Sequence, residues 1–466
     1  VLLHSCVHPS RGSHEVSSWP SLDLLGPWRG ERRTRDPQRR FEAWDEPCAR
    51  RMSSRASDRT WDVVVFGATG FTGKWVVRHL QKEGKEVQWA VAGRSADKLA
   101  QLREELQLSE DVHECVVDAS DLEGLKRITE RAKVAISTVG PFMKHGTPLV
   151  EACVETGTDY CDTTGETPWV RDIIDKYHEK AVENKARIVN CCAFCSLPFD
   201  LGTLMVVDHM KKHLHRKCRS VLAVIGDTKT GISGGSTDSF FNLMGQDSKT
   251  VRTMFDPYQL HPKDGPSKGP DQGILNKVVY SKELESAVGP SFFGMVNSKI
   301  VRRSNALQGN AYGDHFSYDE ATIQKNRFKG WMNWLGSNLS MAFLSIGWFR
   351  HLVRRTMPAP GTARGIVGDQ GYFNLHFVGK TESEEGEESS TVLARARGNL
   401  DPNYAGTAKM VAEAALCLAF RGDELVRQGH PSGGCLTPAT CMGTTLVSRF
   451  QSGDFLSLEI LPAWMS

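Results

Sequence analysis

Three glycines at three-residue steps, directly after a run of apolar residues, form the segment of this sequence best suited to chemistry. Residues 63–66 read Val-Val-Val-Phe, and Gly67, Gly70 and Gly73 follow them. Such a run favours a buried parallel strand, and a tight turn from strand into helix needs glycine where a side chain would clash. The first amides of the next helix can then face phosphate oxygens. The predicted pyrophosphate-binding residues are Gly67, Ala68, Thr69, Gly70, Phe71, Thr72 and Gly73.

A second predicted strand, residues 87–92, is followed by Gly93, Arg94 and Ser95, with Lys98 one helical turn later. Dinucleotide-binding domains that take NAD place an acidic residue near this position to hold the ribose 2′-hydroxyl. A carboxylate would repel a 2′-phosphate, whereas a guanidinium pairs with it through two hydrogen bonds. Arg94, Ser95 and Lys98 therefore predict a site that prefers NADP to NAD.

Two further predicted strands end in residues suited to the same ligand. Residues 113–117 lead to Asp118, where a side chain would border the adenine, and residues 134–138 lead to Val139, Gly140 and Pro141. Ligands of open α/β sheets bind at the carboxyl ends of the strands. We therefore expect all of these residues to line one edge of a single sheet.

Asp162 and Glu166 are the candidate catalytic residues because they follow a short predicted strand, residues 159–162, at that edge. Hydride transfer is done by a nicotinamide, and the protein supplies orientation and one proton. A carboxyl group shifted toward neutral pH by burial could donate that proton. Glu166 could equally cap the helix that follows it. The one C-x-x-C pair, Cys192 and Cys195, has no partners at zinc spacing, so we assign no metal site.

The order of predicted elements gives the fold class. Strands alternate with helices from residue 59 to residue 195, which predicts an α/β fold with a Rossmann-type doubly wound parallel sheet that binds NAD(P). Beyond it the rhythm changes, and residues 196–466 are predicted to form a second α+β domain. Its clearest elements are a strand at 221–225, a helix ending near 244, a hairpin of 372–378 and 392–397 with an acidic tip at 381–390, and a helix at 405–420.

Composition excludes some functions. The net charge of +2 over 466 residues and the absence of a basic stripe with aromatics argue against nucleic-acid binding. The 12 scattered cysteines are typical of reduced thiols in an intracellular protein. Residues 1–58 show no sustained period and no apolar signal region, so we expect a disordered extension, with Met52 as the native start; an organellar transit peptide is the alternative.

Residues 330–349 form a 20-residue segment without a charged side chain, flanked by arginines and lysine. As one helix it would measure about 30 Å, yet its serines and asparagines make it a poor membrane span. Its small residues fall mostly on one face, and the opposite face is rich in tryptophan and leucine. The pattern allows two interpretations: a helix that lies in a membrane interface or a helix buried in the second domain.

Several of these motifs together resemble the saccharopine dehydrogenase-like oxidoreductases, a family that includes trans-acting enoyl reductases of lipid synthesis. The resemblance runs from about Trp61 to the C-terminus. It implies an NAD(P)-binding fold with a second α/β domain and, in many members, association with membranes or lipid droplets. The motifs that carry it are 64–73, 90–95, 140–142, 160–166, 196–202, 233–236 and 434–439.

One position departs from the family pattern, since Cys195 stands where the family usually has aspartate. The loss of that carboxylate could remove a substrate contact or a proton relay, and Cys195 could act as an acid only if its pKa were lowered.

Two functions follow from the sequence. The first is an NADP-dependent reductase of a small, apolar, lipid-like substrate at a membrane or lipid droplet. The second is a nucleotide-binding protein of such a surface with little turnover, favoured by the missing aspartate. A lysine-pathway saccharopine reductase is a weaker third, because its dicarboxylic substrate needs an arginine cluster that the second domain lacks.

Overall fold

The computed structural model describes residues 59–83, 86–270, 275–344, 346–359, 362–383, 388–453 and 455–462. The predicted extension 1–58 and residues 384–387 of the predicted acidic tip lie outside this range. The described residues belong to one unit that begins at Arg59.

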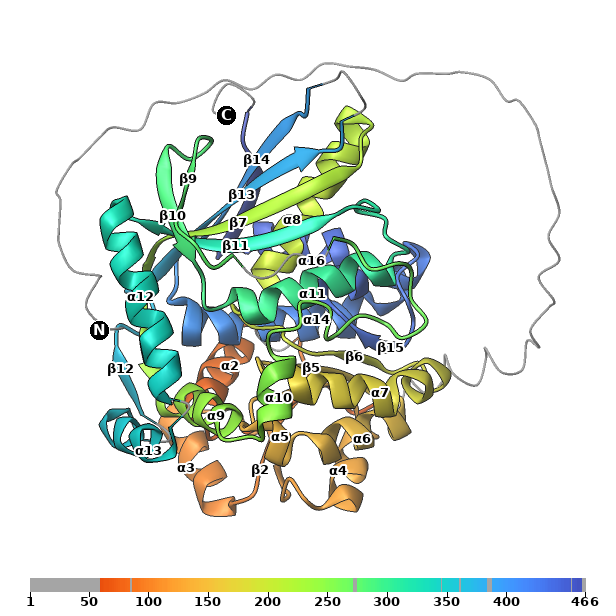
Figure 1. The fold of residues 1–466 in the computed structure, drawn as a ribbon. Coiled ribbons are helices and arrows are strands. Elements are labelled where there is room, and N and C mark those ends of the chain that lie inside the picture. The colour runs from red at the N-terminus through yellow and green to blue at the C-terminus, as the bar shows by residue number, and fades with distance from the viewer. Residues whose placement is uncertain are drawn as a thin grey trace, which may run out of the picture. The chain divides into compact units, whose positions relative to one another are not determined.

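Sheet A is the predicted parallel sheet, and its strand order is β15-β6-β5-β4-β1-β2-β3 (Figure 1). Every strand pair in it is parallel. All six residues of β1 are buried, as expected for a strand covered on both faces. The neighbours of β1 are β4 and β2, so the connections reverse direction there, and this is the point where such sheets bind ligands. The strands are β1 (Trp61–Phe66), β2 (Trp89–Gly93), β3 (His113–Val116), β4 (Ala132–Ser137), β5 (Asp159–Asp162), β6 (Arg187–Val189) and β15 (Gly434–Leu436).

The predicted helices between these strands are present. Thr147 is the first residue of its helix, and Gly146 occupies the N-cap position. The Pro148 ring fits the first turn, where its missing N–H has no helical partner. The helices are α2 (Phe71–Lys82), α3 (Ala96–Leu106), α4 (Leu122–Thr129), α5 (Phe142–His145), α6 (Thr147–Thr156) and α7 (Thr167–Glu183).

Sheet B is mixed, with the order β16-β14-β13-β7-β11-β10-β9. The predicted hairpin is its β13–β14 pair, and Phe373, Leu375 and Phe377 on β13 are fully buried. The strands are β7 (Cys218–Lys229), β9 (Val279–Ser281), β10 (Ser286–Pro290), β11 (Ser317–Gln324), β13 (Tyr372–Thr381), β14 (Thr391–Gly398) and β16 (Leu456–Ile460). The other helical segments here are α8 (Leu197–His209), η1 (Met210–Leu214), α10 (Ser248–Thr253), α11 (Gly294–Leu307), α15 (Pro438–Cys441) and α16 (Gly443–Ser452).

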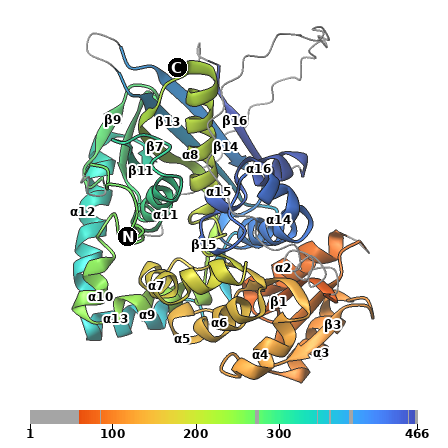
Figure 2. The same cartoon turned by 90° about the vertical axis from the view of Figure 1, so that its right-hand side faces the viewer.

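The chain returns from sheet B to sheet A near its end. Helix α14 (Thr407–Arg427) packs against α2 and against β1, β4 and β5, and β15 pairs with β6. Figure 2 shows α14 between the two sheet layers. Residues 196–466 therefore complete the sheet that residues 59–195 begin. The boundary at 195 stays a prediction, but it does not divide the chain into two separately packed cores.

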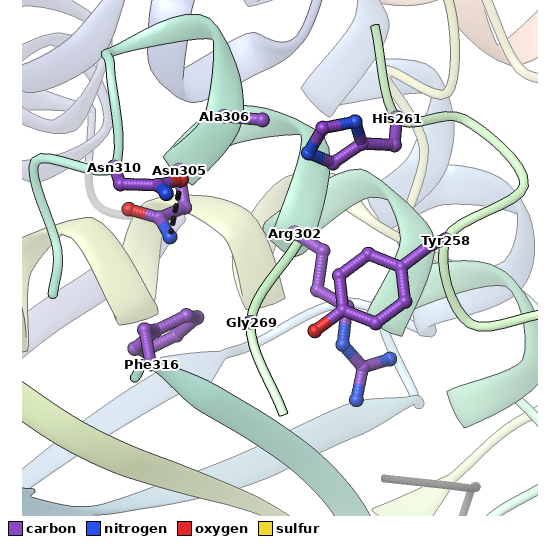
Figure 3. A pocket seen from close by; sticks show the side chains of 8 residues that line it. All are labelled: Tyr258, His261, Gly269, Arg302, Asn305, Ala306, Asn310 and Phe316. Atoms are coloured by element: carbon purple, nitrogen blue, oxygen red, sulfur yellow. Dashed lines mark hydrogen bonds between the residues drawn. The ribbon is translucent and has the colours of Figure 1, made fainter. Parts of the chain in front are cut away.

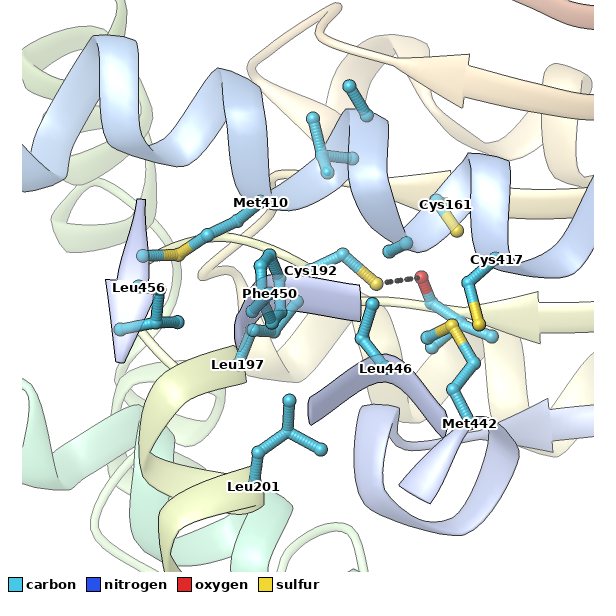
Figure 4. Close-up of a cluster of buried hydrophobic side chains, with 14 of the residues drawn as sticks. Cys161, Cys192, Leu197, Leu201, Met410, Cys417, Met442, Leu446, Phe450 and Leu456 are labelled. Atoms are coloured by element: carbon cyan, nitrogen blue, oxygen red, sulfur yellow. Dashed lines mark hydrogen bonds between the residues drawn. The ribbon is translucent and has the colours of Figure 1, made fainter. Parts of the chain in front are cut away.

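The hydrophobic core also joins the two sheets, because one cluster of buried apolar side chains contains residues from both of them. Figure 4 shows Cys161 and Cys192 of the sheet A side packed with Leu197 and Leu201 of α8, and with α14 and α16 side chains including Met410 and Phe450. The ten described cysteines are free thiols, and most of them pack as small apolar groups.

The segment 330–349 forms parts of two helices. Helix α12 spans Arg327–Leu344 and α13 spans Gly347–Thr356, with Ile346 in an extended conformation before α13. The interpretation as one 30 Å helix is therefore wrong, and so is full burial, because Trp331 and Trp348 are 49% and 69% exposed. Within the described residues, the structure has no helix that is long and apolar enough to cross a bilayer. Beside these helices lie α9 (Gly234–Met244) and the two-stranded sheet of β8 (Gly231–Ser233) and β12 (Ala363–Gly365).

Candidate functional site

The glycine turn after β1 shows why two of its glycines are needed. Gly67 has a φ of +80°, and a Cβ added there would lie 2.8 Å from Thr138 Oγ1. A Cβ on Gly73 would lie 2.1 Å from the Gly67 carbonyl oxygen, so α2 can pack this close to β1 only with glycine. Gly70 differs, since it is exposed and its added Cβ would meet only the Gly67 oxygen, at 3.1 Å. Gly70 thus leaves open space above the turn.

The N-terminus of α2 faces this open space with its positive end. Gly70 is the N-cap, no side chain caps the helix, and the first turn carries no acidic residue. The first amides of a helix have no partners within the helix, and together with the helix dipole they attract anions. The turn therefore has the geometry and the electrostatics of a phosphate site.

The residues predicted to bind the adenosine end lie at the next two strand ends. Arg94 and Lys98 are exposed, and Ser95 caps α3 by accepting a hydrogen bond from the Lys98 amide at 3.3 Å. Hydrogen bonds from Ser120 lower the pKa of Asp118, and the charges of Arg94 and His145 lower it further. Arg94 and Asp118 follow the paired parallel strands β2 and β3, so both lie at the same edge of sheet A. His145 is a further neighbour of Asp118 that sequence reasoning missed.

Glu166 is buried and holds the loop that carries Val139, Gly140 and Pro141. Its two carboxylate oxygens accept hydrogen bonds from the amides of Phe142 and Met143, each at 2.9 Å. These are the first two amides of α5. Glu166 occupies the N-cap position of its own helix, α7, but its side chain makes no capping bond there. Glu166 is therefore the N-cap residue of the following helix, but its side chain caps α5 instead.

Asp162 is fully buried and ties two loops together. Its carboxylate accepts hydrogen bonds from the amides of Thr164 and Cys191, the side-chain amide of Asn190 and the hydroxyl of Tyr160, at 2.7–3.1 Å. Burial raises its pKa to about 6 in spite of these bonds. Every oxygen of Asp162 and of Glu166 is thus occupied by protein donors.

A third buried acid, Glu320 on β11, lies on the sheet B side and was missed by sequence reasoning. It accepts hydrogen bonds from Ser291, from Tyr318 at 3.3 Å and from Asn297 at 2.7 Å. Asn297 in turn accepts a hydrogen bond from Ser196 at 3.0 Å. Burial raises the pKa of Glu320 to about 7. Its only sequence signal is an acid within a strand pattern, which cannot reveal partners 23 and 29 residues away.

Cys195 precedes Ser196 and lies beside the loop of the candidate acids, where a Cβ on Gly165 would be 3.7 Å from its Sγ. Burial, together with the charges of Glu320 and Asp162, raises the pKa of the Cys195 thiol to about 11. The lowered pKa that an acid role would require is therefore not present, and Cys195 stays a neutral thiol at physiological pH.

Segments that follow residue 230 reach the same edge of sheet A. A Cβ on Gly140 would lie 3.2 Å from Ser239 Oγ on α9, and a Cβ on Gly368 would lie 3.0 Å from Trp75 on α2. Tyr404, in the short helical segment η2 (Pro402–Gly406), contacts the Phe71 ring edge-on at 5.0 Å. The glycine turn is thus flanked on one side by sheet A and on the other by α9 and η2. We call this region of the structure the mouth.

Two cavities lie elsewhere, along the 256–269 segment. The one in Figure 3 has Arg302 over the Tyr258 ring at 5.3 Å, and its volume of about 10 Å³ holds no more than a water molecule. A wider cavity of about 410 Å³ is lined by Arg171, Gln259 and Lys263, among others. Neither contains a predicted site residue. Since backbone turns that bind phosphate are shallow, the glycine edge remains the stronger candidate.

Among the described residues, one group could hold a metal ion by its spacing: His79, Glu83 and Glu413. An arginine already supplies the cation there. Arg449 pairs with Glu413 and lies 3.8 Å from Glu83, while His79 lies 2.8 Å from Glu413. We interpret the group as an ion-pair cluster that joins α2 to α14 and α16.

A parallel doubly wound sheet with this glycine turn defines a dinucleotide-binding protein, and comparison with known proteins narrows the class. Residues 63–189 match the family model of the saccharopine dehydrogenase NADP binding domain. The chain is 33% identical over 411 residues to the trans-acting enoyl reductase of Mycobacterium tuberculosis, covering 84% of this chain and 96% of that protein. It is also 33% identical over 435 residues to the trans-acting enoyl reductase of Mycobacterium ulcerans, covering 87% and 99%.

The chain therefore belongs to the saccharopine dehydrogenase-like family of NADP-binding oxidoreductases, and it is an enzyme that uses NADP. Among solved structures, apo saccharopine dehydrogenase (L-Glu forming) from Saccharomyces cerevisiae aligns with a TM-score of 0.47 at 14% identity. That alignment covers 86% of this chain and all of the other.

Proposed function

We propose that this enzyme uses NADPH to reduce a carbon–carbon double bond of an apolar, lipid-like acyl substrate presented at a membrane or lipid-droplet surface. The relatives are named enoyl reductases, which suggests the bond. The observation that carries the lipid assignment is the exposed aromatic and basic surface of α12 and α13, which lies next to the helix that borders the glycine turn.

The cofactor residues in this proposal are those that the sequence singled out. Residues 67–73 would hold the pyrophosphate through backbone amides, and the space above Gly70 fits it. Arg94, Ser95 and Lys98 would hold the 2′-phosphate, Asp118 would border the adenine, and residues 139–141 would border the nicotinamide ribose. The bound nicotinamide would supply the hydride.

Asp162 and Glu166 enter the proposal as residues that position the site. Each is enclosed, and each uses its oxygens to hold backbone amides of loops at the sheet edge. Such contacts fix where the 139–141 and 163–166 loops stand relative to a bound cofactor. In this arrangement neither carboxyl group is free to touch a substrate. A proton from Asp162 or Glu166 would therefore reach the substrate only after a loop moves.

The aromatic–basic surface consists of exposed apolar and cationic side chains on or next to α12 and α13. Its most exposed members are Phe328 at 70% and Trp348 at 69%. The sequence from 321 to 368 contains seven lysines and arginines and no aspartate or glutamate. The surface comprises Lys325, Arg327, Phe328, Lys329, Trp331, Met332, Leu339, Phe343, Ile346, Trp348, Leu352 and Arg355.

This combination fits the interface of an anionic membrane. Exposed apolar patches of this kind mark interaction sites, and tryptophan and phenylalanine with neighbouring cations favour the headgroup region of anionic lipids. Two contacts connect the surface to the site: Arg350 donates to the Met244 carbonyl at the end of α9 at 2.8 Å, and Arg354 pairs with Asp238 on α9. A substrate taken from the lipid would enter beside α9.

The test is NADPH oxidation by the full chain with a trans-2-enoyl thioester carried in vesicles of anionic or of neutral phospholipid. We expect oxidation with a stoichiometric saturated product, and faster turnover on anionic vesicles. The double variant Phe328→Ser/Trp348→Ser should lower vesicle binding about tenfold or more, since each side chain would leave a buried position in the interface.

The matched control is Phe420→Ser, which removes an exposed aromatic (46% exposed) from α14, outside the surface. It should leave vesicle binding unchanged. Equal losses in both variants, or equal binding to neutral and anionic vesicles, would contradict the membrane assignment while leaving the cofactor assignment untouched.

A further inference from the structure

Two helix N-termini, one from each side of the mouth, converge on the ring of Tyr404. Phe71, the first residue of α2, contacts the ring edge-on at 5.0 Å. On the other side, the hydroxyl groups of Ser233 and Ser236 lie close enough to the Tyr404 hydroxyl to lower its pKa, against the larger effect of burial, which raises it. Ser233 is the N-cap of α9.

The Tyr404 hydroxyl is buried without a matched partner. The residue is 1% exposed, and among the described residues no donor or acceptor meets hydrogen-bond geometry with its hydroxyl, Ser233 and Ser236 included. A buried hydroxyl without a hydrogen bond costs about 1–3 kcal/mol. A buried hydroxyl that is retained at this cost, beside two helix N-termini, is placed to bind a ligand.

The N-terminus of α9 is partly occupied by bonds within the protein. The Gly234 amide donates to the Thr362 carbonyl at 3.0 Å, and the Ser236 amide donates to the Ser233 hydroxyl at 3.3 Å. Gly235 and Ser236 are exposed, and the first turn has no acidic residue. The Gly235 amide and the Ser236 hydroxyl are therefore the groups of this N-terminus that an anion could contact.

Helix α9 lies close to the predicted cofactor-binding residues. Ser239, one turn along α9, lies against Gly140, and Asn403 next to Tyr404 donates to the Gly231 carbonyl before α9 at 2.8 Å. Helix α9 therefore lies against residues 139–141, and Tyr404 connects its start to the first residue of α2.

We propose that the Tyr404 hydroxyl, the Ser236 hydroxyl and the N-terminus of α9 form a second anionic-oxygen subsite opposite the glycine turn. It rests on the proposed function, because it borders the same mouth. Its ligand is an oxygen that carries negative charge, either of the dinucleotide's pyrophosphate or of the substrate's carbonyl group as it gains charge during reduction. Tyr404 stays protonated at neutral pH and donates to that oxygen.

The experiment compares Tyr404→Phe and Ser236→Ala with the wild-type full chain in three titrations. NADPH reports the whole cofactor, adenosine 2′-monophosphate, which lacks the pyrophosphate, reports the adenosine end alone, and turnover of a trans-2-enoyl thioester at saturating NADPH reports the substrate. Tyr280→Phe, an exposed tyrosine on β9, is the matched control. Phenylalanine keeps the ring contact with Phe71, so the fold should persist, and Ser236→Ala tests the subsite without the tyrosine.

Loss of a hydrogen bond to a charged oxygen should cost about tenfold. If the ligand is the pyrophosphate, both variants bind NADPH about tenfold more weakly and the monophosphate equally well. If the ligand is the substrate oxygen, NADPH binding is unchanged and kcat falls about tenfold. Unchanged NADPH binding with unchanged kcat, or equal losses for NADPH and the monophosphate, would overturn the subsite. Failure of the wild type to bind NADPH would instead overturn the proposed function.

Discussion

The edge of sheet A and the segments that face it from beyond residue 230 build the site by different means. Sheet A contributes backbone: a turn shaped by Gly67 and Gly73, the open amides of α2, and a loop held through its amides by Glu166. The facing segments contribute side chains: Tyr404, Ser236 and the Glu320 network. A backbone site binds a feature that all dinucleotides share, whereas side chains can be exchanged to suit one substrate. In the proposed function, cofactor binding belongs to the first region and substrate selection to the second.

The largest effect, on stability, is expected when a methyl group is added to the glycine turn of sheet A. Gly73→Ala would place a methyl group 2.1 Å from the Gly67 oxygen, so α2 must move away from β1. We expect a loss of about 3 kcal/mol or more in the free energy of unfolding, or failure to fold. Gly70→Ala is the matched variant, because its methyl group meets only one atom at 3.1 Å. It should unfold within about 2 °C of the wild type and bind NADPH at least tenfold more weakly.

Thermal unfolding and NADPH titration of the two variants check this pair. Should Gly70→Ala bind NADPH as the wild type does, the space above Gly70 would not be the pyrophosphate position, and the assignment of residues 67–73 would have to be withdrawn.

A smaller effect is expected at the proposed adenosine end, where the side chain of Arg94 would distinguish NADPH from NADH. Arg94→Ala should weaken NADPH binding about 10- to 100-fold and NADH binding much less, since only NADPH offers a 2′-phosphate to the guanidinium. Calorimetry with both nucleotides measures the ratio. Equal losses for NADPH and NADH would show that Arg94 supports the loop and does not bind the phosphate.

The smallest of the three effects concerns the side-chain region and depends on pH. The folded protein keeps the proton on Glu320 up to about pH 7, whereas the unfolded chain releases it near pH 4.5. The folded state therefore binds more protons in this window, and the stability contributed by Glu320 falls as the pH rises through it. Glutamine stays neutral, so Glu320→Gln should gain about 2 kcal/mol relative to the wild type between pH 5 and pH 8.

Urea unfolding of both proteins at the two pH values gives this difference, and Glu130→Gln, at an exposed position, is its control. A difference between Glu320→Gln and the wild type that does not change with pH would mean that Glu320 is charged in the folded protein.

The same comparison explains what the sequence could and could not predict. The parallel sheet, the glycine turn, Arg94 and the β13–β14 hairpin follow from local patterns, because each depends on residues close together in the chain. The roles of Glu166 and Asp162 could not be predicted, since each is decided by amides 23–29 residues away. Glu320 likewise depends on partners 23 and 29 residues away, and Tyr404 contacts Phe71, more than 300 residues earlier in the chain. The break after α12 was missed because the absence of charge from 330 to 349 carries no signal for a bend at Ile346.

The return of the chain to sheet A also determines how this protein can be made. Strand β15 begins only at Gly434, and α14, which covers β1, β4 and β5, begins only at Thr407. During synthesis, the glycine turn leaves the ribosome more than 300 residues before the helix that shields its sheet. For most of translation, the nascent dinucleotide-binding region therefore lacks the helix that covers this apolar face in the folded protein, and exposed apolar surface of this kind favours aggregation.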